Sequence, residues 1–522
     1  MTITQQMLLL MLLLDLTEHG AVGVQQMGCS SSTNANETAS CLQAAFDEAL
    51  PGDVVEIPFT GEPWVVNRPL VLRKHGVSLR LLPGVILEAQ RGQFHGISDC
   101  LLTVGGLAEP VVGVSVRGSP GACLRMHRAD YANSTLYTKA EWRHGLQLVN
   151  VVDAVVEELR IEQTGGDGIY VDQASNTVIR NVDMADNYRQ GMSVIAADGL
   201  LVEDCLMHGT NGTNPQAGLD IEPNRPQDEL VNITLSRCSS YNNTGNQLDV
   251  FLTCLRYRVC GQAERASAVV PGHISRHDLR SPERRAMLTM AAAVAANKSI
   301  APLSLRPTSI TFQDCSTTSF ASYNGPHNGC GGSLGCGDGL IISGVYSPGS
   351  ITVDRFRAVH NGGSGISIGK AITSDGKNSG ALPTLVIRDT VLQSNNPDQH
   401  EWRGVQDAEV HLLTLPPSFD PNVTGFGGVL LENVSIIKDL KTTNNRTSWL
   451  TTVGTGTISD IKGTVTVYSV IGCPLMPPSL GTATDVNLDV VCVPIEDNHG
   501  GRRIKSHGTA DSQTKQPTLL HW

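Results

Sequence analysis

A short motif, glycine followed by an apolar, a variable and an apolar residue, recurs in the middle of the chain at intervals of 23, 23 and 27 residues. Its copies are Gly145-Leu-Gln-Leu, Gly168-Ile-Tyr-Val, Gly191-Met-Ser-Val and Gly218-Leu-Asp-Ile. A second apolar run follows each copy, and the motif resumes at Gly339, Gly365 and Gly428. A unit of this length cannot bury its apolar face alone, so the repeat predicts stacked units that share one core.

The pattern within each unit indicates the kind of solenoid. In a strand, the two apolar residues of the motif point inward and the residue between them points outward. The glycine permits a sharp bend at a corner. A leucine-rich repeat has a different leucine pattern, and a β-propeller blade needs about 40 residues. We therefore predict an all-β fold, a right-handed parallel β-helix.

The segment before the first strands predicts a cap. Apolar residues of Ala39–Leu50 fall on one helical face, and Thr38 or Ser40 would cap the helix before Pro51 ends it. Short apolar runs follow. We predict a short N-terminal helix that covers the open end of the core, in a β-helix over residues 38–495.

Three segments fall outside this pattern. Residues 1–22 contain the apolar run Met7–Leu14, which has the length of a signal-peptide core and is too short to span a bilayer. No basic residue precedes the run, so a frayed apolar N-terminus is the alternative. Residues 256–307 break the rhythm and predict an inserted loop or helix, or a disordered segment. Residues 500–522 are polar and predict a disordered tail.

Composition bounds the location and partners. The net charge is −12 and no basic run stands out, so a nucleic-acid partner is not expected, and neither is stable membrane insertion. Close cysteine pairs favour an oxidising compartment: Cys254/Cys260, Cys330/Cys336 and Cys473/Cys492. N-glycosylation acceptors occur at Asn36, Asn133, Asn211, Asn232, Asn242, Asn297, Asn422, Asn433 and Asn445. We expect a secreted monomer.

The repeat also aligns the polar residues of successive units. Neighbouring units of a parallel sheet lie about 4.8 Å apart. The residues that the alignment gathers on one outward surface are Arg143, His144, Asp167, Tyr170, Asp172, Arg189, Asp220 and Glu222. Three of them have a plain structural alternative: Asp167 as a turn residue, Arg189 as a partner for an acid of a neighbouring unit, and His144 as a structural histidine.

These residue types suit polysaccharide chemistry. Asp220 and Glu222 share a strand face about 6.5–7 Å apart, and Asp172 lies two units from Glu222, about 9.6 Å away. Glycoside hydrolysis needs two carboxyl groups, about 6.5–9.5 Å apart in inverting enzymes. Asp220, Glu222, Asp172 and Asp167 are therefore the candidate catalytic residues. Arg143, His144, Arg189 and Tyr170 are the candidate substrate-binding residues, because arginines hold acidic groups and aromatic rings stack on sugars.

At these positions the chain resembles the pectin-lyase-like superfamily. The resemblance rests on the helix followed by PGDVVEIP, on Gly-Gly-Asp167-Gly-Ile-Tyr-Val, on Asn187-Tyr-Arg-Gln-Gly-Met-Ser-Val, and on Ala217-Gly-Leu-Asp220-Ile-Glu222-Pro-Asn. It covers residues 39–491 without the insertion. It implies a right-handed β-helix that acts on polysaccharides, but the polygalacturonase and alginate-epimerase motifs are absent.

Three functions remain open at this point. The first is a secreted carbohydrate-active enzyme, a glycoside hydrolase without a cofactor, in which Asp220 and Glu222 supply acid and base. The second is a lyase of a uronate polymer with Arg189 or His144 as base. The third is a non-catalytic, glycan-binding or adhesin-like solenoid. A Ca²⁺ site made of Asp167, Asp172, Asp220 and Glu222 is a further alternative, since carboxylates suit this ion.

Overall fold

The computed structural model describes residues 21–31, 34–106, 108–225, 227–252 and 306–319, and then a series of shorter segments. The shorter segments are 337–343, 349–369, 371–373, 384–395, 401–402, 405–406, 409–413, 423–438, 449–453, 457–469, 483–495 and 518–521. The apolar run at 7–14, nearly all of the expected insertion and most of the expected tail lie outside the described residues. So do the first two expected cysteine pairs and Cys473.

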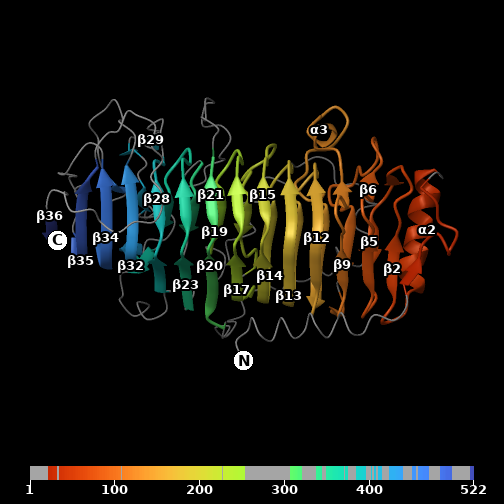
Figure 1. The fold of residues 1–522 in the computed structure, drawn as a ribbon, viewed down its shortest axis with the longest axis horizontal. Coiled ribbons are helices and arrows are strands. Elements are labelled where there is room, and N and C mark those ends of the chain that lie inside the picture. The colour runs from red at the N-terminus through yellow and green to blue at the C-terminus, as the bar shows by residue number, and fades with distance from the viewer. Residues whose placement is uncertain are drawn as a thin grey trace, which may run out of the picture.

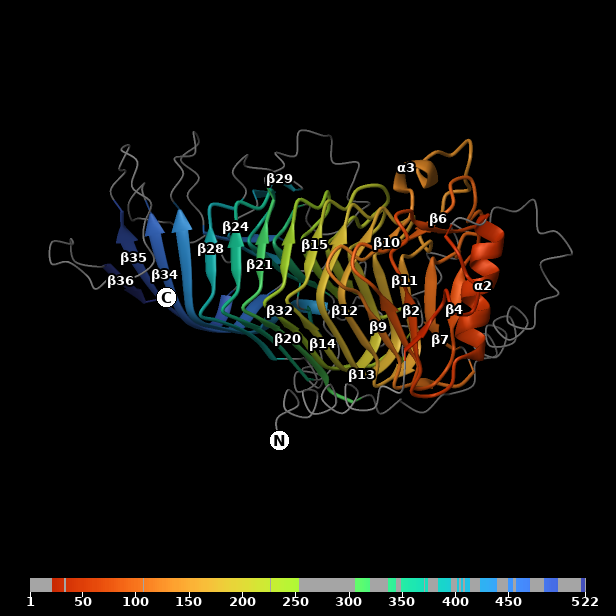
Figure 2. The ribbon, with the colours of Figure 1, turned by 45° about the vertical axis from the view of Figure 1, so that its right-hand side comes forward.

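The described strands form a parallel β-helix, as the repeat predicts (Figure 1). Face 1 contains β4 (Leu70–Leu72), β7 (Leu102–Gly105), β11 (Leu146–Val152), the first parts of β13 (Ile169–Ala185) and β14 (Met192–Glu203), β16 (Leu219–Ile221), β19 (Leu248–Phe251), β22 (Leu340–Ser343), β25 (Ile366–Gly369), β31 (Val410–Leu413) and β33 (Leu450–Val453). The faces are stacks of neighbouring strands, one strand from each coil (Figure 2).

Two further faces complete each coil. Face 2 contains β1 (Ala21–Gly23), β2 (Val54–Ile57), β5 (Ser78–Leu81), β9 (Ser115–Arg117), the start of β12 (Val155–Glu162), the middle of β13, the end of β14, β17 (Leu230–Ser236), β20 (Thr308–Gln313), β23 (Gly349–Asp354), β27 (Thr384–Arg388), β32 (Val423–Lys438), β34 (Thr457–Ser469) and β35 (Ala483–Pro494). Face 3 contains β3 (Trp64–Val66), β6 (Ile86–Ala89), β10 (Cys123–Arg125), the ends of β12 and β13, β15 (Leu206–His208), β18 (Ser239–Tyr241), β21 (Ser316–Thr318), β24 (Arg357–Val359), β28 (Val391–Gln393) and the ends of β32, β34 and β35.

A few strands lie outside these three stacks. β8 (Val111–Val112) pairs with the end of β11. The antiparallel pairings are β26 (Ala371–Thr373) with β32, β29 (Glu401–Trp402) with β30 (Val405–Gln406), and β35 with β36 (Thr518–His521).

The glycine motif predicts the register of face 1 correctly over most of its length. Leu146, Ile169, Met192 and Leu219, which directly follow the four aligned glycines, are paired in successive coils. All four are fully buried in the core. The alignment is wrong at Gly428, because this residue belongs to β32, whose next residues pair with β27 on face 2.

The expected helix is confirmed as α2 (Ala35–Glu48), although it begins earlier than predicted. The N-cap is Asn34, whose side chain accepts a hydrogen bond from the Glu37 N–H at 3.0 Å, rather than Thr38 or Ser40. The side-chain amide of Gln43 accepts from the Val71 N–H and donates to the Val71 carbonyl, at 2.9 and 2.8 Å. The helix therefore satisfies part of the open edge of β4 as well as covering the core.

A disulfide and a strand secure this end of the solenoid. Cys29 and Cys41 form a disulfide that the sequence did not predict. β1 pairs with β2 through Ala21–Gly23, so the ordered structure extends before residue 38, the expected start of the β-helix. Among the described residues, the helices are α2 and the short α3 (Arg128–Tyr131), and neither is long and apolar enough to cross a membrane.

The corner between face 3 and face 1 is shaped by buried asparagines. Each stands directly after a residue with positive φ, such as Asp186 at 56°. The side-chain oxygens of Asn187 and Asn243 accept hydrogen bonds from the N–H of Thr164 and Thr210 in the preceding coil, at 3.3 and 3.0 Å. These bonds satisfy buried backbone donors and fix the chain just before it enters face 1.

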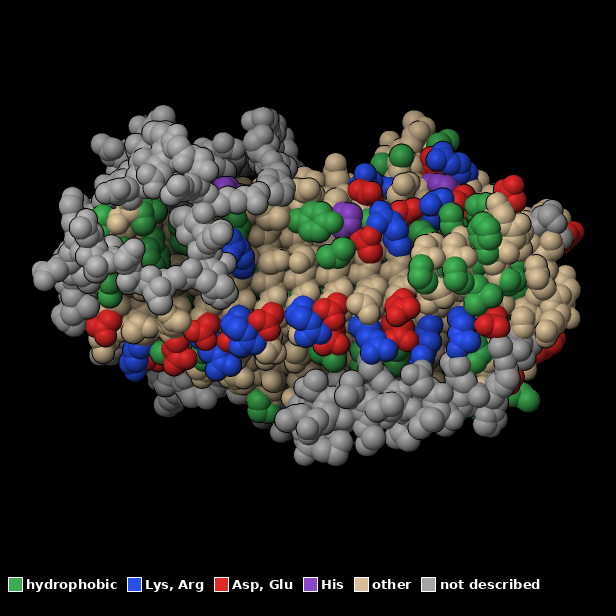
Figure 3. Space-filling view, viewed as in Figure 1, with side chains coloured by type: hydrophobic (Ala, Val, Ile, Leu, Met, Phe, Trp, Pro, Cys, Tyr) green, Lys and Arg blue, Asp and Glu red, His purple; other side chains and the backbone are tan. Residues whose placement is uncertain are grey.

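Arginines and acids on faces 2 and 3 pair with one another across neighbouring coils. Figure 3 shows blue and red side chains alternating in a row along the solenoid. Examples are Arg180 with Glu157, Arg237 with Glu203 and Asp204, and Arg355 with Asp314. The charges of this row are therefore compensated locally.

Gly191→Ala is expected to destabilise the protein by about 1–3 kcal/mol, because this corner is tightly packed. A Cβ at this position would lie 2.5 Å from the Gly218 carbonyl oxygen and 3.0 Å from the Met207 Cβ. Gly23→Ala is the matched control, since its Cβ would meet only the Gln26 side chain at 3.9 Å. Urea denaturation of both variants measures the difference in stability. Equal urea midpoints for Gly191→Ala and Gly23→Ala would contradict the prediction.

Candidate functional site

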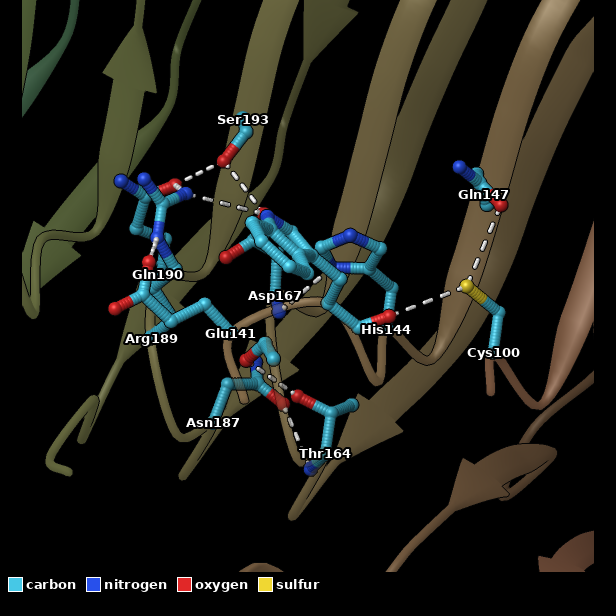
Figure 4. Close-up of polar contacts among 12 residues, drawn as sticks. Cys100, Glu141, His144, Gln147, Thr164, Asp167, Asn187, Arg189, Gln190 and Ser193 are labelled. Atoms are coloured by element: carbon cyan, nitrogen blue, oxygen red, sulfur yellow. Dashed lines mark hydrogen bonds and ion pairs between the residues drawn. The ribbon is translucent and has the colours of Figure 1, made fainter. Parts of the chain in front are cut away.

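Most of the polar residues gathered by the repeat lie near the corner between face 3 and face 1, whereas Arg143 and Asp172 make their contacts elsewhere. The loop that carries α3 contributes a further acid, Glu141, to this corner. The eight residues that form a connected group are Glu141, His144, Asp167, Arg189, Gln190, Ser193, Asp220 and Glu222, and we call them the Arg189 cluster. Figure 4 shows most of them in contact around Arg189.

Arg189 stands at the centre of the cluster with its guanidinium facing three carboxylates. Its Nε lies 3.6 Å from Glu141, its Nη1 3.6 Å from Asp167 and its Nη2 3.6 Å from Glu222. Nη1 also donates to the Gln190 side-chain oxygen at 2.9 Å. Burial opposes the charge on Arg189, but the carboxylates of Asp167, Asp220 and Glu222 raise its pKa above the usual range. Arg189 is therefore a fixed cation.

Asp167 lies beneath Arg189 and is fully buried. It accepts a hydrogen bond from the Ser193 hydroxyl at 2.7 Å, and its backbone N–H donates to Nδ1 of His144 at 3.0 Å. Burial raises the pKa of Asp167 to about 6, although Arg189 and Ser193 oppose the shift. Asp167 is thus both the turn residue of Gly166-Asp167-Gly168 and a buried carboxyl group whose pKa is raised.

Asp220 and Glu222 are neighbours on β16 and just beyond it, but they differ in exposure. Asp220 is 1% exposed, whereas the side chain of Glu222 is 35% exposed. Oδ2 of Asp220 accepts a hydrogen bond from the Gln190 amide at 2.5 Å. Burial and the charges of Glu222 and Asp249 raise the pKa of Asp220 well above its usual value, although the charge of Arg189 opposes the shift. These surroundings therefore favour the protonated form of Asp220.

The structure corrects the expectation that these side chains all point to an open surface. Asp167 and Asp220 are buried because the corner residues Arg189 and Gln190 and the loop residue Glu141 surround them. The most exposed charged groups of the cluster are the carboxylates of Glu222 and Glu141, at 35% and 34%.

His144 and Tyr170 lie next to each other at the side of the cluster. Their rings stack with centroids 4.7 Å apart. Burial, followed by the charge of Arg189, lowers the pKa of His144 to about 3, so this histidine is neutral at physiological pH. Its Nδ1 is occupied by the N–H of Asp167. His144 therefore orients its neighbours and supplies no charge.

Arg143 has a structural position rather than the solvent-facing one expected of a substrate-binding residue. It is fully buried, and its guanidinium donates to the carbonyls of Phe94, His95, Gly96 and Thr138 at 2.9–3.1 Å. The rings of Tyr131 and Tyr137 lie 5.6 and 5.3 Å from its central carbon. Arg143 thereby joins the loop of residues 94–96 to the loop that carries Glu141.

Arg143→Met is expected to lower the free energy of unfolding by about 3 kcal/mol, because the four carbonyls that hold this buried guanidinium lose a charged donor. The thermal midpoint without any glycan is the measurement. A substrate-binding role without a structural one would leave this midpoint unchanged, and that result would contradict the assignment. Arg91→Met is the control, since Arg91 makes only an exposed contact, 3.3 Å from Asp130.

Asp172 is separated from the Arg189 cluster. A bulge shifts the register between β13 and β14 at this residue, and its carboxylate binds Arg225 at 2.5 Å. Arg225 also contacts Asp228 at 2.7 Å. Within the described part of the chain, no group of three or more histidine, cysteine or acidic side chains has the geometry of a metal site, so Asp167, Asp172, Asp220 and Glu222 do not form a common Ca²⁺ cage there.

Sequence reasoning missed two further buried acids beside the cluster. Asp249 directly follows Asp220 in the register of face 1, and both of its carboxylate oxygens are buried without a hydrogen bond. Asp338 lies one coil further and its pKa is raised to about 6 by burial. Gly337-Asp-Gly-Leu repeats Gly166-Asp-Gly-Ile, which was a usable signal. Glu141 lies outside the repeat and had no such signal.

Comparisons with known proteins support the fold. Residues 112–258 match the family model described as "Right handed beta helix region". Two proteins of Bacillus subtilis (strain 168) are similar in part: uncharacterized protein YclG, 26% identical over 139 residues (23% of this chain, 24% of YclG), and SPbeta prophage-derived uncharacterized protein YorA, 24% identical over 187 residues (32% and 31%). The chain thus spans a quarter to a third of the length of these curated relatives.

Solved structures give the same result over most of the chain. The A-module of mannuronan C-5 epimerase AlgE6 of Azotobacter vinelandii matches with a TM-score of 0.57 and 14% identity, covering 91% of this chain and 100% of the module. The AlgE4 A-module of the same organism matches with a TM-score of 0.53 and 13% identity, covering 89% and 100%. The predicted right-handed parallel β-helix, pectin-lyase-like in fold, is therefore confirmed.

Proposed function

We propose that this chain is a secreted, carbohydrate-active enzyme, a glycoside hydrolase that cleaves an extracellular polysaccharide at the Arg189 cluster. The observation that carries the proposal is the buried Asp220, whose pKa is raised well above its usual value, next to the partly exposed Glu222. A general acid must hold its proton at the working pH and reach the substrate. Here burial and the neighbouring acids favour the protonated form of Asp220, and Glu222, two residues further along the chain, is partly exposed.

A second carboxylate, that of Glu141, also lies against Arg189. Glu141 and Glu222 contact Nε and Nη2 of the same guanidinium at 3.6 Å each. Because those nitrogens are about 2.3 Å apart, the two carboxylate oxygens are at most about 9.5 Å apart. Glycosidases place their acid and base within about 5–9.5 Å. We assign Glu141 as the base or nucleophile. Arg189, which also contacts Asp167, would supply a positive charge next to both Glu141 and Glu222.

Aromatic side chains near the cluster provide sugar contacts. Trp142 follows Glu141 and is 43% exposed, and Tyr170 is partly exposed beside His144. The flat apolar face of an aromatic ring suits stacking on a sugar ring. Tyr170 and Trp142 are therefore the proposed substrate contacts, whereas Arg143 and His144 hold the site in shape.

The lyase alternative is less well supported by the same geometry. A lyase needs a base that is unprotonated at the working pH and strong enough to remove a proton from carbon. Arg189 retains its proton because three carboxylates raise its pKa, and the low pKa of His144, about 3, makes it a weak base. The adhesin alternative gives no role to the raised pKa of the buried Asp220, a feature that is frequent at catalytic sites.

Secretion is consistent with two features of the described residues. The Cys29–Cys41 disulfide is typical of an oxidising compartment. The glycosylation acceptors Asn36, Asn133, Asn211, Asn242 and Asn433 are exposed. The proteins with similar folds include enzymes named for a polysaccharide, mannuronan, which supports a carbohydrate substrate here.

A panel of polysaccharides tests the proposal with two readouts. Hydrolysis releases reducing ends, whereas a lyase also produces an unsaturated sugar that absorbs in the near ultraviolet. Reducing ends without ultraviolet absorbance support the hydrolase. Absorbance that grows with the reducing ends would establish a lyase, and binding without cleavage of any polymer would establish the adhesin.

A further inference from the structure

We infer that the Arg189 cluster selects glycans without carboxylate or sulfate groups, an inference that rests on the proposed function and names its substrate class. The charged side chains that the cluster exposes most are Glu141 and Glu222. Both are acids, and each lies 3.6 Å from a nitrogen of the same buried guanidinium. A glycan chain that reaches Glu222 therefore also comes close to the negative charge of Glu141.

The cation of the cluster is not available for an acidic sugar. Recognition of a carboxylate or sulfate by arginine uses a free edge of the guanidinium and two parallel hydrogen bonds. Arg189 is 11% exposed and already faces Glu141, Asp167 and Glu222. Its Nε is buried without a hydrogen bond, and the group it faces is again a carboxylate, Glu141.

The neighbouring arginines are also occupied. Arg225 binds Asp172 at 2.5 Å and Asp228 at 2.7 Å. Arg143 is buried among backbone carbonyls, and Arg128 donates to the Gly209 carbonyl at 2.9 Å. An acidic sugar would have to displace one of these partners, and it would leave a buried acid or carbonyl without its donor.

Long-range charge acts in the same direction. The net charge of −12 repels polyanions before contact, and this effect weakens as salt rises. By contrast, an uncharged sugar can use Trp142 and Tyr170 as stacking surfaces and the exposed carboxylates as hydrogen-bond acceptors for its hydroxyls. These contacts favour uncharged rings over acidic ones.

Binding to matched glycans tests the inference. The full chain is titrated with oligosaccharide pairs that differ only in an acidic group, such as dextran against dextran sulfate oligomers. We expect at least about 10-fold tighter binding of the non-acidic member of any pair that binds. The double variant E141Q/E222Q removes two local charges and is expected to reduce this preference several-fold.

Two control variants separate local from general charge effects. E203Q/D204N removes the same number of charges from the pair with Arg237, away from the cluster, and is expected to preserve the preference. K139Q removes an exposed lysine from the loop that carries Glu141 and is also expected to preserve it. Tighter binding of the acidic members, binding of no non-acidic glycan, or an equal change in E203Q/D204N would overturn the inference.

The outcomes also separate this inference from the proposed function. Preferred binding of uncharged glycans without cleavage would overturn the proposal of a hydrolase and support the inferred substrate selectivity. Cleavage with a preference for an acidic polymer would support the proposal of a hydrolase and overturn the inferred selectivity.

Discussion

Asp220→Asn is expected to lower kcat about 10³-fold on the polysaccharide that the panel identifies, with little change in KM. General acid catalysis contributes about 10²–10⁴-fold, and Asn cannot supply the proton that Asp220 holds. Asn keeps the shape of the side chain and can still contact Gln190, so the corner should remain folded. Steady-state kinetics measured with reducing-end release give both constants.

Glu222→Gln should cause a similar loss, because the charge of Glu222 helps to raise the pKa of Asp220 and so supports its proposed role as the acid. The double variant should then lose little more than either single variant, since residues that act as a unit are strongly non-additive. Asp204→Asn is the matched control, as it removes an exposed acid paired with Arg237 on the other side of the coil. Independent, multiplying losses from Asp220→Asn and Glu222→Gln would contradict this coupling.

The second expected result is that the protein becomes less stable as pH rises above about 4. Asp167, Asp220, Asp249 and Asp338 are all buried, and burial raises the pKa of each. For Asp167 the change is from 3.8 to about 6. Between these values the folded protein keeps a proton that the unfolded chain has released, so the free energy of unfolding falls by about 3 kcal/mol for this group. The pKa values of Asp220 and Asp249 are raised in the same direction, so both groups add to this fall.

Asp249→Asn should therefore raise the urea midpoint at pH 8, which corresponds to a free energy of unfolding that is larger by about 3 kcal/mol. At pH 4 the midpoint should change little. Both carboxylate oxygens of Asp249 lack a hydrogen bond, so the neutral amide loses little. Asp204→Asn should have the opposite sign at pH 8, because Arg237 lowers the pKa of Asp204 and the charged form is the stabilising one. A urea midpoint of the parent chain that rises steadily from pH 4 to pH 8 would contradict this account.

The fold could be predicted from the sequence because every coil repeats the same inward-facing positions. Leu146, Ile169, Met192 and Leu219 obey the alignment, since a one-residue slip would expose the core side chains. The alignment fails at Gly428 because a glycine before an apolar pair also suits face 2. The start of α2 was misplaced because Asn34 caps the helix from a polar stretch without periodicity.

The candidate site was only partly predictable. The repeat identifies which residues share a coil position, so it brought Asp167, Arg189, Asp220 and Glu222 together correctly. It does not tell how far a corner or an adjacent loop covers those positions, so the burial of Asp220 was missed. Glu141 reaches the cluster from a loop whose position depends on Arg143 and two tyrosines, and no repeat encodes that contact.

The register of face 1 has a consequence for how such a molecule can change over evolution. Leu219 and Leu248 are paired neighbours separated by 29 residues, whereas Leu248 and Leu340 are equally close neighbours separated by 92. Adding tens of residues at a corner therefore leaves the ladder on either side intact. Corner segments can be lengthened, exchanged or lost while the stack retains its hydrogen bonds. New specificities can thus arise next to Asp220 and Glu222 by replacing a neighbouring loop, without any substitution in the core that supports them.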